Sequence, residues 1–372
     1  MNMQSHGLRD IHHELSRRDL LRLSALGLSG LGLAAIAGCG DGDNPRSPTS
    51  TPGAAVDPPP ETTTIRLSKN TFNPRTAPLF LAEQFLPAEG FTNVQYIDET
   101  PFDTQQGLAA GEMDIHLIIA DELIAGADAG NPLVILAGVH NSCFELFGNE
   151  RVQSLRDLKG KRIWVLGADA TRQPYGLDAS HRPYGSVETL LAYVGIDRSK
   201  VEFIELSVGD GLTQMEAGTI DAVAVGPPLS TLLHANHLGH VVLNGMTDAP
   251  WSQYFCCMVA GNRDFVEKHP AATKRALRAI LKAADMCAKE PQRAAHYVVD
   301  RGFTPFTYDQ ALDAIAGLSY TAWRDFNPED TMRFYALRLK EAGIIKSTPD
   351  ELIARATDWH FLNEIKRELG VA

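Results

Sequence analysis

The feature that most limits the fold of this chain is the alternation of short apolar runs with helical patterns. The first series of expected strands comprises residues 64–68, 94–97, 115–119 and 134–139, and the expected helices between them comprise residues 77–85, 104–110 and 122–127. Strands that alternate with helices form parallel sheets that are covered by helices. The pattern therefore predicts an α/β fold with helices on both faces of a mostly parallel sheet.

A second series of the same kind follows along the chain. Its expected strands comprise residues 162–166, 201–206, 222–225 and 241–244, and its expected helices comprise residues 186–194 and 212–217. The pattern Ala-Gly-x-x-Asp occurs once in each series, at 110–114 and at 217–221. Glycine readily takes the left-handed conformation that ends a helix, so Gly111 and Gly218 are expected helix caps. This repetition predicts two lobes that are built alike.

The C-terminal part of the chain is helical in pattern. After an expected strand at 255–260, the expected helices comprise residues 270–289, 292–301, 308–318, 328–342 and 349–369. Prolines at or near several of the starts favour helix initiation. Because such helices must bury their apolar stripes, we expect this helical block to pack on the first lobe.

The N-terminus has the pattern of an export signal. The pair Arg17-Arg18 precedes residues 23–37, a stretch without any charged residue, and this arrangement resembles a twin-arginine signal. The stretch is shorter than the roughly 20 apolar residues that a membrane-spanning helix needs. Small residues then lead into Cys39, as in the lipobox of bacterial lipoproteins. We expect a lipid anchor on Cys39 and a location in the periplasm or on the outer face of the cell membrane.

Composition excludes one class of partner. Acidic residues outnumber basic residues by 46 to 34, which gives a net charge of −12. This charge repels phosphate backbones, so we expect no nucleic-acid partner. Membrane contact is expected only through the lipid anchor, and we expect a monomer.

Cysteine and histidine spacing indicates no metal site. The cysteines after Cys39 are Cys143, Cys256, Cys257 and Cys287, and none shows the spacing of metal ligands or of a disulfide framework. We interpret them as buried free thiols, while their pairing stays open.

The run His234, His237 and His240 is interpreted as a solvated helix end, since no nearby acid or thiol completes a ligand set. Gly239 is the expected end of that helix.

Several segments resemble a known family. They are residues 77–82, 108–114, 154–162, 215–222 and 262–270. In this order and spacing they resemble the solute-binding proteins of bacterial importers of the nitrate, taurine and alkanesulfonate type, which include carriers of thiamine-precursor pyrimidines. The resemblance covers most of residues 64–370. It implies the two-lobed type II periplasmic-binding-protein fold, hinge closure on a solute, and delivery to the permease and ATPase subunits of an ABC importer.

These observations predict four parts of the chain. Residues 1–38 form the signal peptide, 39–63 a disordered tether rich in proline, 64–143 with 250–372 the first lobe and its C-terminal helices, and 144–249 the second lobe. Open α/β sheets bind ligands at the carboxyl ends of their strands. The solute site is therefore expected in the cleft between the lobes.

The candidate ligand-binding residues are those that follow the expected strands or mark the crossings between lobes. They are Asn70, Thr71, Phe72, Asp121, His140, Asn141, Arg182, Tyr184, Gly185, Ser186, Gly226, Pro227, Trp251 and Tyr254. Backbone N–H groups at the Gly185-Ser186 helix start suit an acidic ligand group, and simple capping by Ser186 is the alternative. Tyr184, Trp251 and Tyr254 suit stacking on a ring, and packing of the hinge is the alternative.

Charge placement indicates the character of the solute. The candidate loops hold Arg75, His140, Arg172 and Arg182 against Asp121 and Asp169, a basic bias within an acidic protein. We therefore expect a small organic solute, either an anion such as a sulfonate or a carboxylate, or a heterocycle. The alternative is that these arginines point to solvent, as most surface arginines do.

Catalytic motifs are absent from the sequence. It has no Gly-x-Ser-x-Gly, no Walker loop and no dinucleotide fingerprint after the first expected strand, so we expect neither an enzyme nor a cofactor. Pyrimidine synthases of thiamine biosynthesis share the fold, and Phe255-Cys256-Cys257 resembles their cysteine-rich segment. Residues 254–260 are nevertheless a continuous apolar run, which is typical of a buried strand. The alternatives are such an enzyme and a sensor-linked binding protein of the same fold.

Overall fold

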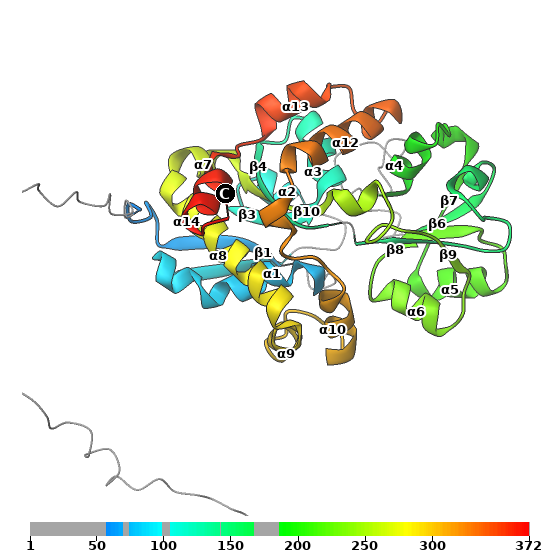
Figure 1. Cartoon of the computed structure of the whole chain (residues 1–372), viewed down its shortest axis with the longest axis horizontal. Helices are drawn as coiled ribbons and strands as arrows, with labels where there is room; N and C mark the ends of the chain where they lie inside the picture. Colours follow the sequence, from blue (N-terminus) through cyan, green and yellow to red (C-terminus); the bar gives the residue numbers. More distant parts are fainter. Residues whose placement is uncertain (1–56, 70–73, 99–104, 142, 167–185, 372) are drawn as a thin grey trace, which may run out of the picture. The chain divides into compact units, whose positions relative to one another are not determined.

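A computed structural model describes residues 57–69, 74–98, 105–141, 143–166 and 186–371. These residues belong to one compact unit, 56–372. Their strands form two five-stranded sheets, each with helices packed against it (Figure 1). The α/β class is therefore confirmed.

The first sheet contains the expected strands of the first series together with β10. Its members are β1 (Thr64–Lys69), β2 (Asn93–Asp98), β3 (Ile115–Ile119), β4 (Leu133–Asn141) and β10 (Phe255–Asn262). Their order is β2-β1-β3-β10-β4. Strands β1, β2 and β3 are parallel, and β10 is antiparallel to both β3 and β4. Four of the five strands therefore run in one direction, and β10 alone is reversed.

The second sheet repeats this plan. Its members are β5 (Glu145–Gly148), β6 (Arg162–Leu166), β7 (Glu202–Leu206), β8 (Ala222–Val225) and β9 (His240–Asn244). Their order is β7-β6-β8-β5-β9, and β5 is antiparallel to both of its neighbours. The sequence predicts no strand at β5, whose four residues begin with a glutamate and end with a glycine. Its place between two other strands buries all four of them.

The described helices cover both sheets. They are α1 (Ala77–Leu81), α2 (Gln106–Ala109), α3 (Ala120–Asp128), α4 (Ser186–Tyr193), α5 (Val208–Glu216), α6 (Leu229–Ala235), α7 (Arg263–Lys268), α8 (Pro270–Lys289), α9 (Pro291–Asp300), α10 (Tyr308–Ala316), α11 (Ala322–Asp325), α12 (Pro328–Glu341), α13 (Pro349–Ala356) and α14 (His360–Glu368). None of the helices in the described part of the chain combines the length and the apolar character that crossing a membrane requires.

The repeated Ala-Gly-x-x-Asp pattern has the same structural role in both sheets. Gly111 and Gly218 follow α2 and α5 with φ angles of 73° and 68°, so the expected left-handed caps are confirmed. The aspartate of each repeat then ties two strands together. Asp114 accepts a hydrogen bond from the backbone N–H of Arg66 on β1, and Asp221 accepts one from the backbone N–H of Arg162 on β6.

The prediction of one last helix over residues 349–369 is wrong, because the structure has two helices there. It is interrupted between α13 and α14, where Thr357 has an extended conformation and forms a parallel bridge with Ile135 of β4. The backbone N–H of Asp358 donates to the carbonyl of Ile135 at 3.0 Å. The chain leaves the helix because pairing with β4 satisfies its backbone groups.

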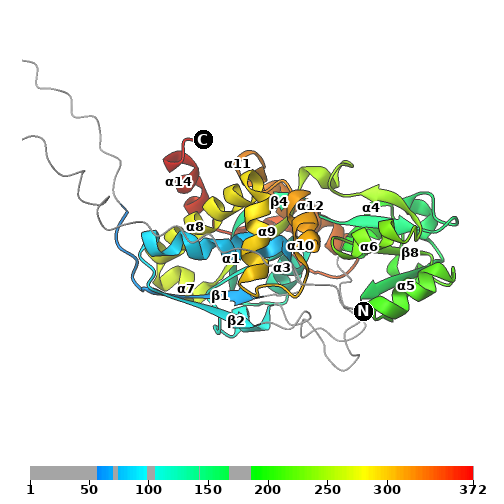
Figure 2. The ribbon, with the colours of Figure 1, turned by 90° about the horizontal axis from the view of Figure 1, so that it is seen from below.

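The C-terminal helices pack mainly on the first sheet. α8 contacts α1 and β4, and Figure 2 shows α8 beside α1. α12 contacts α3 near the first sheet and α4 near the second. Packing of the helical block on the first sheet is therefore confirmed, and α12 also links it to the second.

Ion pairs attach the first described residues to α8. Arg278 on α8 pairs with Asp57, with Glu368 at 2.7 Å and with Glu89 at 2.5 Å. The Glu89 side chain is only 6% exposed. Its burial opposes ionisation, but hydrogen bonds from Arg278 and Lys282 outweigh burial and hold the pKa of Glu89 below its usual 4.5. The buried Glu89 side chain thus stays ionised because Arg278 and Lys282 are beside it.

We predict that Arg278→Met lowers the free energy of unfolding at neutral pH by about 3–5 kcal/mol, because it leaves a buried carboxylate with one cation fewer. Glu89 stabilises the fold fully above its unfolded pKa of 4.5, and this contribution is lost as pH falls through the lower folded pKa. Urea denaturation at several pH values should therefore show the difference shrinking on acidification. Arg293→Met is the matched control, since Arg293 is 54% exposed; a difference independent of pH would contradict the prediction.

Candidate functional site

The two sheets are joined where their strands end. β4 ends at Asn141 and β5 begins at Glu145, so the first crossing is short. Glu145 lies opposite Val225, the last residue of β8, and Phe255, the first residue of β10, lies opposite Asn141. Both sheets therefore present the carboxyl ends of their strands to the same crossing. In open α/β folds this edge is where ligands bind.

The structure describes about half of the expected ligand-binding residues. Those described in full are Asp121, His140, Asn141, Gly226, Pro227, Trp251 and Tyr254. Those outside the described residues are Asn70, Thr71, Phe72, Arg182, Tyr184 and Gly185, as are Arg172, Asp169 and the lipidation residue Cys39. Ser186 is the first residue of α4, but its side chain is also outside the description.

Asp121 has the most perturbed carboxyl group at this edge. It is the second residue of α3, directly after β3, and only 4% of it is exposed. Its Oδ1 accepts a hydrogen bond from the backbone N–H of Glu122 at 2.9 Å. Burial raises the pKa of Asp121 to about 6. A buried carboxyl group of this kind, at the carboxyl end of a strand, is typical of a functional site.

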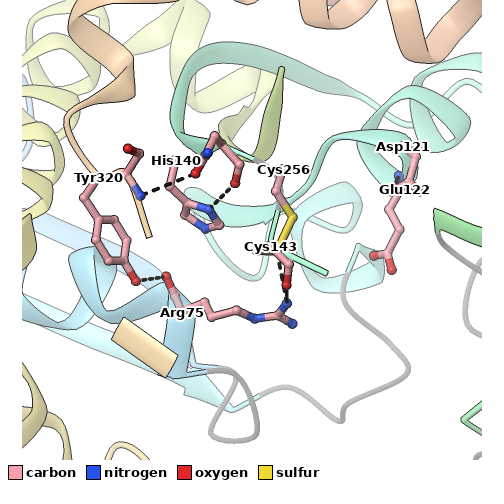
Figure 3. Close-up of a disulfide and its surroundings, with 9 residues drawn as sticks. Arg75, Asp121, Glu122, His140, Cys143, Cys256 and Tyr320 are labelled. Carbon is pink, nitrogen blue, oxygen red and sulfur yellow. Dashed lines mark hydrogen bonds between the residues drawn. A yellow bond between two sulfur atoms is a disulfide. The ribbon is translucent and has the colours of Figure 1, made fainter. Parts of the chain in front are cut away.

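Arg75 brings a positive charge to the crossing. Its Nη1 donates to the carbonyl oxygen of Cys143 at 3.1 Å and lies 3.0 Å from the Cys143 sulfur (Figure 3). Its own carbonyl accepts a hydrogen bond from the Tyr320 hydroxyl at 2.8 Å. A Cβ on Gly226 would lie 2.3 Å from the Cys143 carbonyl oxygen and 2.6 Å from Nη1 of Arg75. The end of β8 can therefore approach this contact only because residue 226 is a glycine.

The sequence places His140 among the basic residues of the site, but its side chain is neutral in the structure. It is fully buried, and burial lowers the pKa of its ring to about 3. Its Nδ1 lies 2.8 Å from the carbonyl oxygen of Asn141. Because a carbonyl only accepts, Nδ1 carries the ring proton and donates it to this bond. The basic bias of the described loops therefore rests on Arg75.

Trp251 and Tyr254 pack against other aromatic rings in this structure. Trp251 is 1% exposed, and its ring meets the ring of Tyr193 edge to face at 4.8 Å. Tyr254 stacks on Phe334 of α12 with ring centroids 4.2 Å apart. The second crossing comprises residues 245–254, between β9 and β10. Both side chains thus pack where this crossing meets α4 and α12.

The interpretation of all four cysteines as free thiols is wrong for two of them. Cys143 and Cys256 form a disulfide, with their Cα atoms 6.0 Å apart (Figure 3). They lie 113 residues apart along the chain, so no local spacing indicated the pair. Cys143 belongs to the first crossing and Cys256 to the strand that follows the second, so the bond connects both crossings. Cys257 and Cys287 are buried free thiols.

The histidine run differs in detail from expectation. Its helix, α6, ends at Ala235 rather than at Gly239. His234 Nε2 lies 3.1 Å from a carboxylate oxygen of Glu145. Sequence reasoning missed this acid, because Glu145 is 89 residues away and reaches His234 only through the pairing of β5 with β8 and β9.

The chain can be compared with known proteins. A family profile described as the NMT1-like family matches residues 76–299, which is more than half of the chain. The chain belongs to the NMT1-like family. The bicarbonate-binding protein CmpA of Synechococcus elongatus is 29% identical over 101 residues, which cover 27% of this chain and 22% of CmpA. The chain thus matches about a fifth of the length of that relative.

Solved structures share the fold. The periplasmic nitrate-binding protein NrtA from Synechocystis superposes with a TM-score of 0.62 at 16% identity, covering 84% of this chain and 90% of NrtA. The periplasmic aliphatic sulphonate-binding protein SsuA from Escherichia coli gives a TM-score of 0.57 at 15% identity, covering 78% of this chain and 92% of SsuA. The expected periplasmic-binding-protein fold is therefore confirmed.

We predict that Asp121→Asn stabilises the protein at neutral pH by about 3 kcal/mol, because the carboxyl group is harder to ionise in the fold than in the unfolded chain. A raised folded pKa penalises the native state above the unfolded pKa of 3.8, and the penalty is complete above about 6. Urea denaturation should therefore show the advantage of the variant growing as pH rises from about 4 to about 7.

Asp128 on the same helix provides a control of opposite sign. Its carboxylate accepts hydrogen bonds from the backbone N–H groups of Lys346 and Ser347 at 3.0 and 2.9 Å. Burial opposes its ionisation, but the hydrogen bond from the Ser347 side chain together with these two backbone bonds outweighs burial and lowers the pKa of Asp128. Asp128→Asn should therefore destabilise the protein at neutral pH. If Asp121→Asn also destabilised the protein, the raised pKa of Asp121 would be contradicted.

Proposed function

We propose that this protein is an exported, lipid-anchored receptor that binds a small organic anion and delivers it to the permease and ATPase subunits of an ABC importer. The observation that carries the proposal is the meeting of both sets of strand carboxyl ends at one pair of crossings. Membership of the NMT1-like family and the fold shared with NrtA and SsuA support a receptor. The two relatives of shared fold are named for nitrate and aliphatic sulphonate, which are both anions.

The charges of the described residues support an anion that also carries a hydrogen-bond donor. Arg75 offers a guanidinium group, whose donors match the oxygens of a sulfonate or carboxylate. His140 is neutral and adds no charge. Asp121 offers an acceptor for a hydroxyl or amine elsewhere on the solute. Arg182 and the Gly185-Ser186 helix start complete the proposed site.

Contacts across the crossings support closure around the solute. α12, from the C-terminal block, contacts α4 beside the second sheet, and the Thr231 hydroxyl of α6 bonds the Asp313 carboxylate of α10. Gly226 already lies beside Arg75, and closure would bring the rest of the second sheet toward Asp121. The solute would then stabilise the fold by mass action, because it binds only the native state.

We predict that calorimetric titration detects binding of sulfonates or carboxylates and none of neutral pyrimidines. Arg75→Ala should weaken binding roughly 10- to 150-fold, which corresponds to about 1.5–3 kcal/mol for a hydrogen-bonded charge. Arg182→Ala and Ser186→Ala should also weaken it. At one hundred times the dissociation constant, the solute should raise the free energy of unfolding by about 2.7 kcal/mol.

The matched control for this titration is Arg293→Ala. Arg293 is an exposed arginine on α9 that pairs with Glu290, and its loss should leave affinity unchanged. If the protein bound only neutral pyrimidines, the proposal of an anionic solute would be wrong, while the proposed receptor role would be retained. An unchanged affinity in Arg75→Ala would remove Arg75 from the site.

We predict that the mature protein begins at an acylated Cys39 and sediments with membranes. Cys39→Ala should move it to the soluble fraction, because the anchor is then lost. Cell fractionation with N-terminal sequencing measures both effects. Cys287→Ala is the control, since Cys287 is a buried thiol in α8 and should not affect partitioning. A mature N-terminus far from Cys39 would contradict the anchor.

A further inference from the structure

Three cysteines and a histidine converge at the first crossing. The side chains are those of His140, Cys143, Cys256 and Cys257, and their ligand atoms all lie within 4.8 Å of one another. All four residues are buried. Tetrahedral zinc, with bonds to sulfur of about 2.3 Å, needs sulfur atoms roughly 3.8 Å apart. The sulfur atoms of Cys143 and Cys256 are bonded to each other in this structure and must separate on reduction, so the cluster reaches the dimensions of a zinc site only in the reduced chain.

A β-bulge makes this convergence possible. Adjacent residues of a regular strand point to opposite faces of the sheet. The register of β10 against β4 shifts between Phe255 and Cys257 and again between Cys257 and Met258. As a result, Cys256 and Cys257 both belong to the core cluster that includes α8, while Phe255 and Met258 belong to the cluster on the other face. The bulge thus aims two neighbouring sulfurs at one place.

His140 has the hydrogen bonding of a metal ligand. Its Nδ1–H donates to the Asn141 carbonyl, so the lone pair of Nε2 is available. Nε2 is buried and has no hydrogen-bond partner among the described residues. Metal-binding histidines commonly donate their other ring N–H to a backbone carbonyl, because this bond fixes the tautomer and the ring orientation. A buried acceptor without a partner is otherwise costly.

The geometry points to a redox-gated metal site, in which the chain with its Cys143–Cys256 bond reduced binds one zinc ion through Cys143, Cys256, Cys257 and His140. Three thiolates, a neutral imidazole and Zn²⁺ carry a net charge of −1. The guanidinium of Arg75, 3.0 Å from the Cys143 sulfur, balances that charge. Charge balance matters here because an unpaired buried charge is strongly destabilising.

The gating step is thiol–disulfide exchange. A dithiol reductant transfers two electrons and two protons to the Cys143–Cys256 bond, and it leaves as its own disulfide. The chain then has three thiols in the cluster. Zinc binds them as thiolates and releases their three protons to solvent. A disulfide oxidant reverses the step: it takes two electrons from the Cys143 and Cys256 thiolates and two protons from solvent, and it leaves as a dithiol. Zinc is then released, because two of its four ligands are lost.

Metal titration of the full chain carrying Cys39→Ser tests this inference, with the chain reduced by a phosphine under anaerobic conditions. We expect one zinc per reduced chain by native mass spectrometry and none per oxidised chain. Cobalt(II) should give the visible bands of a tetrahedral site with thiolate-to-metal charge transfer. The cobalt spectrum is recorded on a chain whose four cluster residues are unchanged, so this test does not depend on whether a cluster variant folds. A reduced chain that binds no zinc, or a cobalt spectrum without thiolate bands, would overturn the site.

Two variants and a matched control assign the ligands. Cys257→Ser and His140→Gln should each weaken zinc binding by more than the roughly 10- to 100-fold that loss of an outer hydrogen bond costs. Cys287→Ser removes the other buried free thiol, which lies outside the cluster, and should bind zinc as the parent does. Equal losses in Cys257→Ser and Cys287→Ser would show nonspecific thiol binding and overturn the assignment.

Discussion

The rest of the structure depends on the reversal of one strand in each sheet. β5 and β10 each run against their neighbours, because each begins where the chain arrives from the other sheet. This reversal places the carboxyl ends of both sets of parallel strands at the same crossings. The disulfide between Cys143 and Cys256 joins these crossings covalently. Arg75, Asp121 and His140 therefore gather at one edge although they come from different elements.

Burial determines the charge of this edge. Asp121 is harder to ionise than a free aspartate and His140 is harder to protonate than a free histidine, and burial is the cause in both. Around α8 the opposite holds, since Glu89 is buried beside Arg278 and Lys282 and its pKa falls. Paired charges thus stabilise the attachment of the first described residues to α8. At the sheet edge, by contrast, the buried carboxyl group of Asp121 lowers the stability of the fold. Such a cost is common where a protein must bind something.

Long elements with regular patterns were predictable, whereas short or irregular ones were not. β1, β3 and α8 lie close to their expected bounds, because apolar periodicity directly reflects which face is buried. The strand Glu145–Gly148 has no such pattern and exists because two neighbours pair with it. The chain leaves its last expected helix at Thr357 because β4 accepts a backbone bridge there. Of the expected site, Asp121 and Gly226 do lie at the crossing, while Trp251 packs against other rings.

The sequence by itself determined the α/β class and the repeated Ala-Gly-x-x-Asp caps, and it predicts the sheet edge at which to look for a site, because these follow from local periodicity and from the conformational freedom of glycine. Tertiary structure decided which side chains meet there. The Cys143–Cys256 bond spans 113 residues, and Cys257 joins the same group only through a bulge in β10. Local spacing carries no information about such contacts, since they depend on strand register between segments that are distant along the chain.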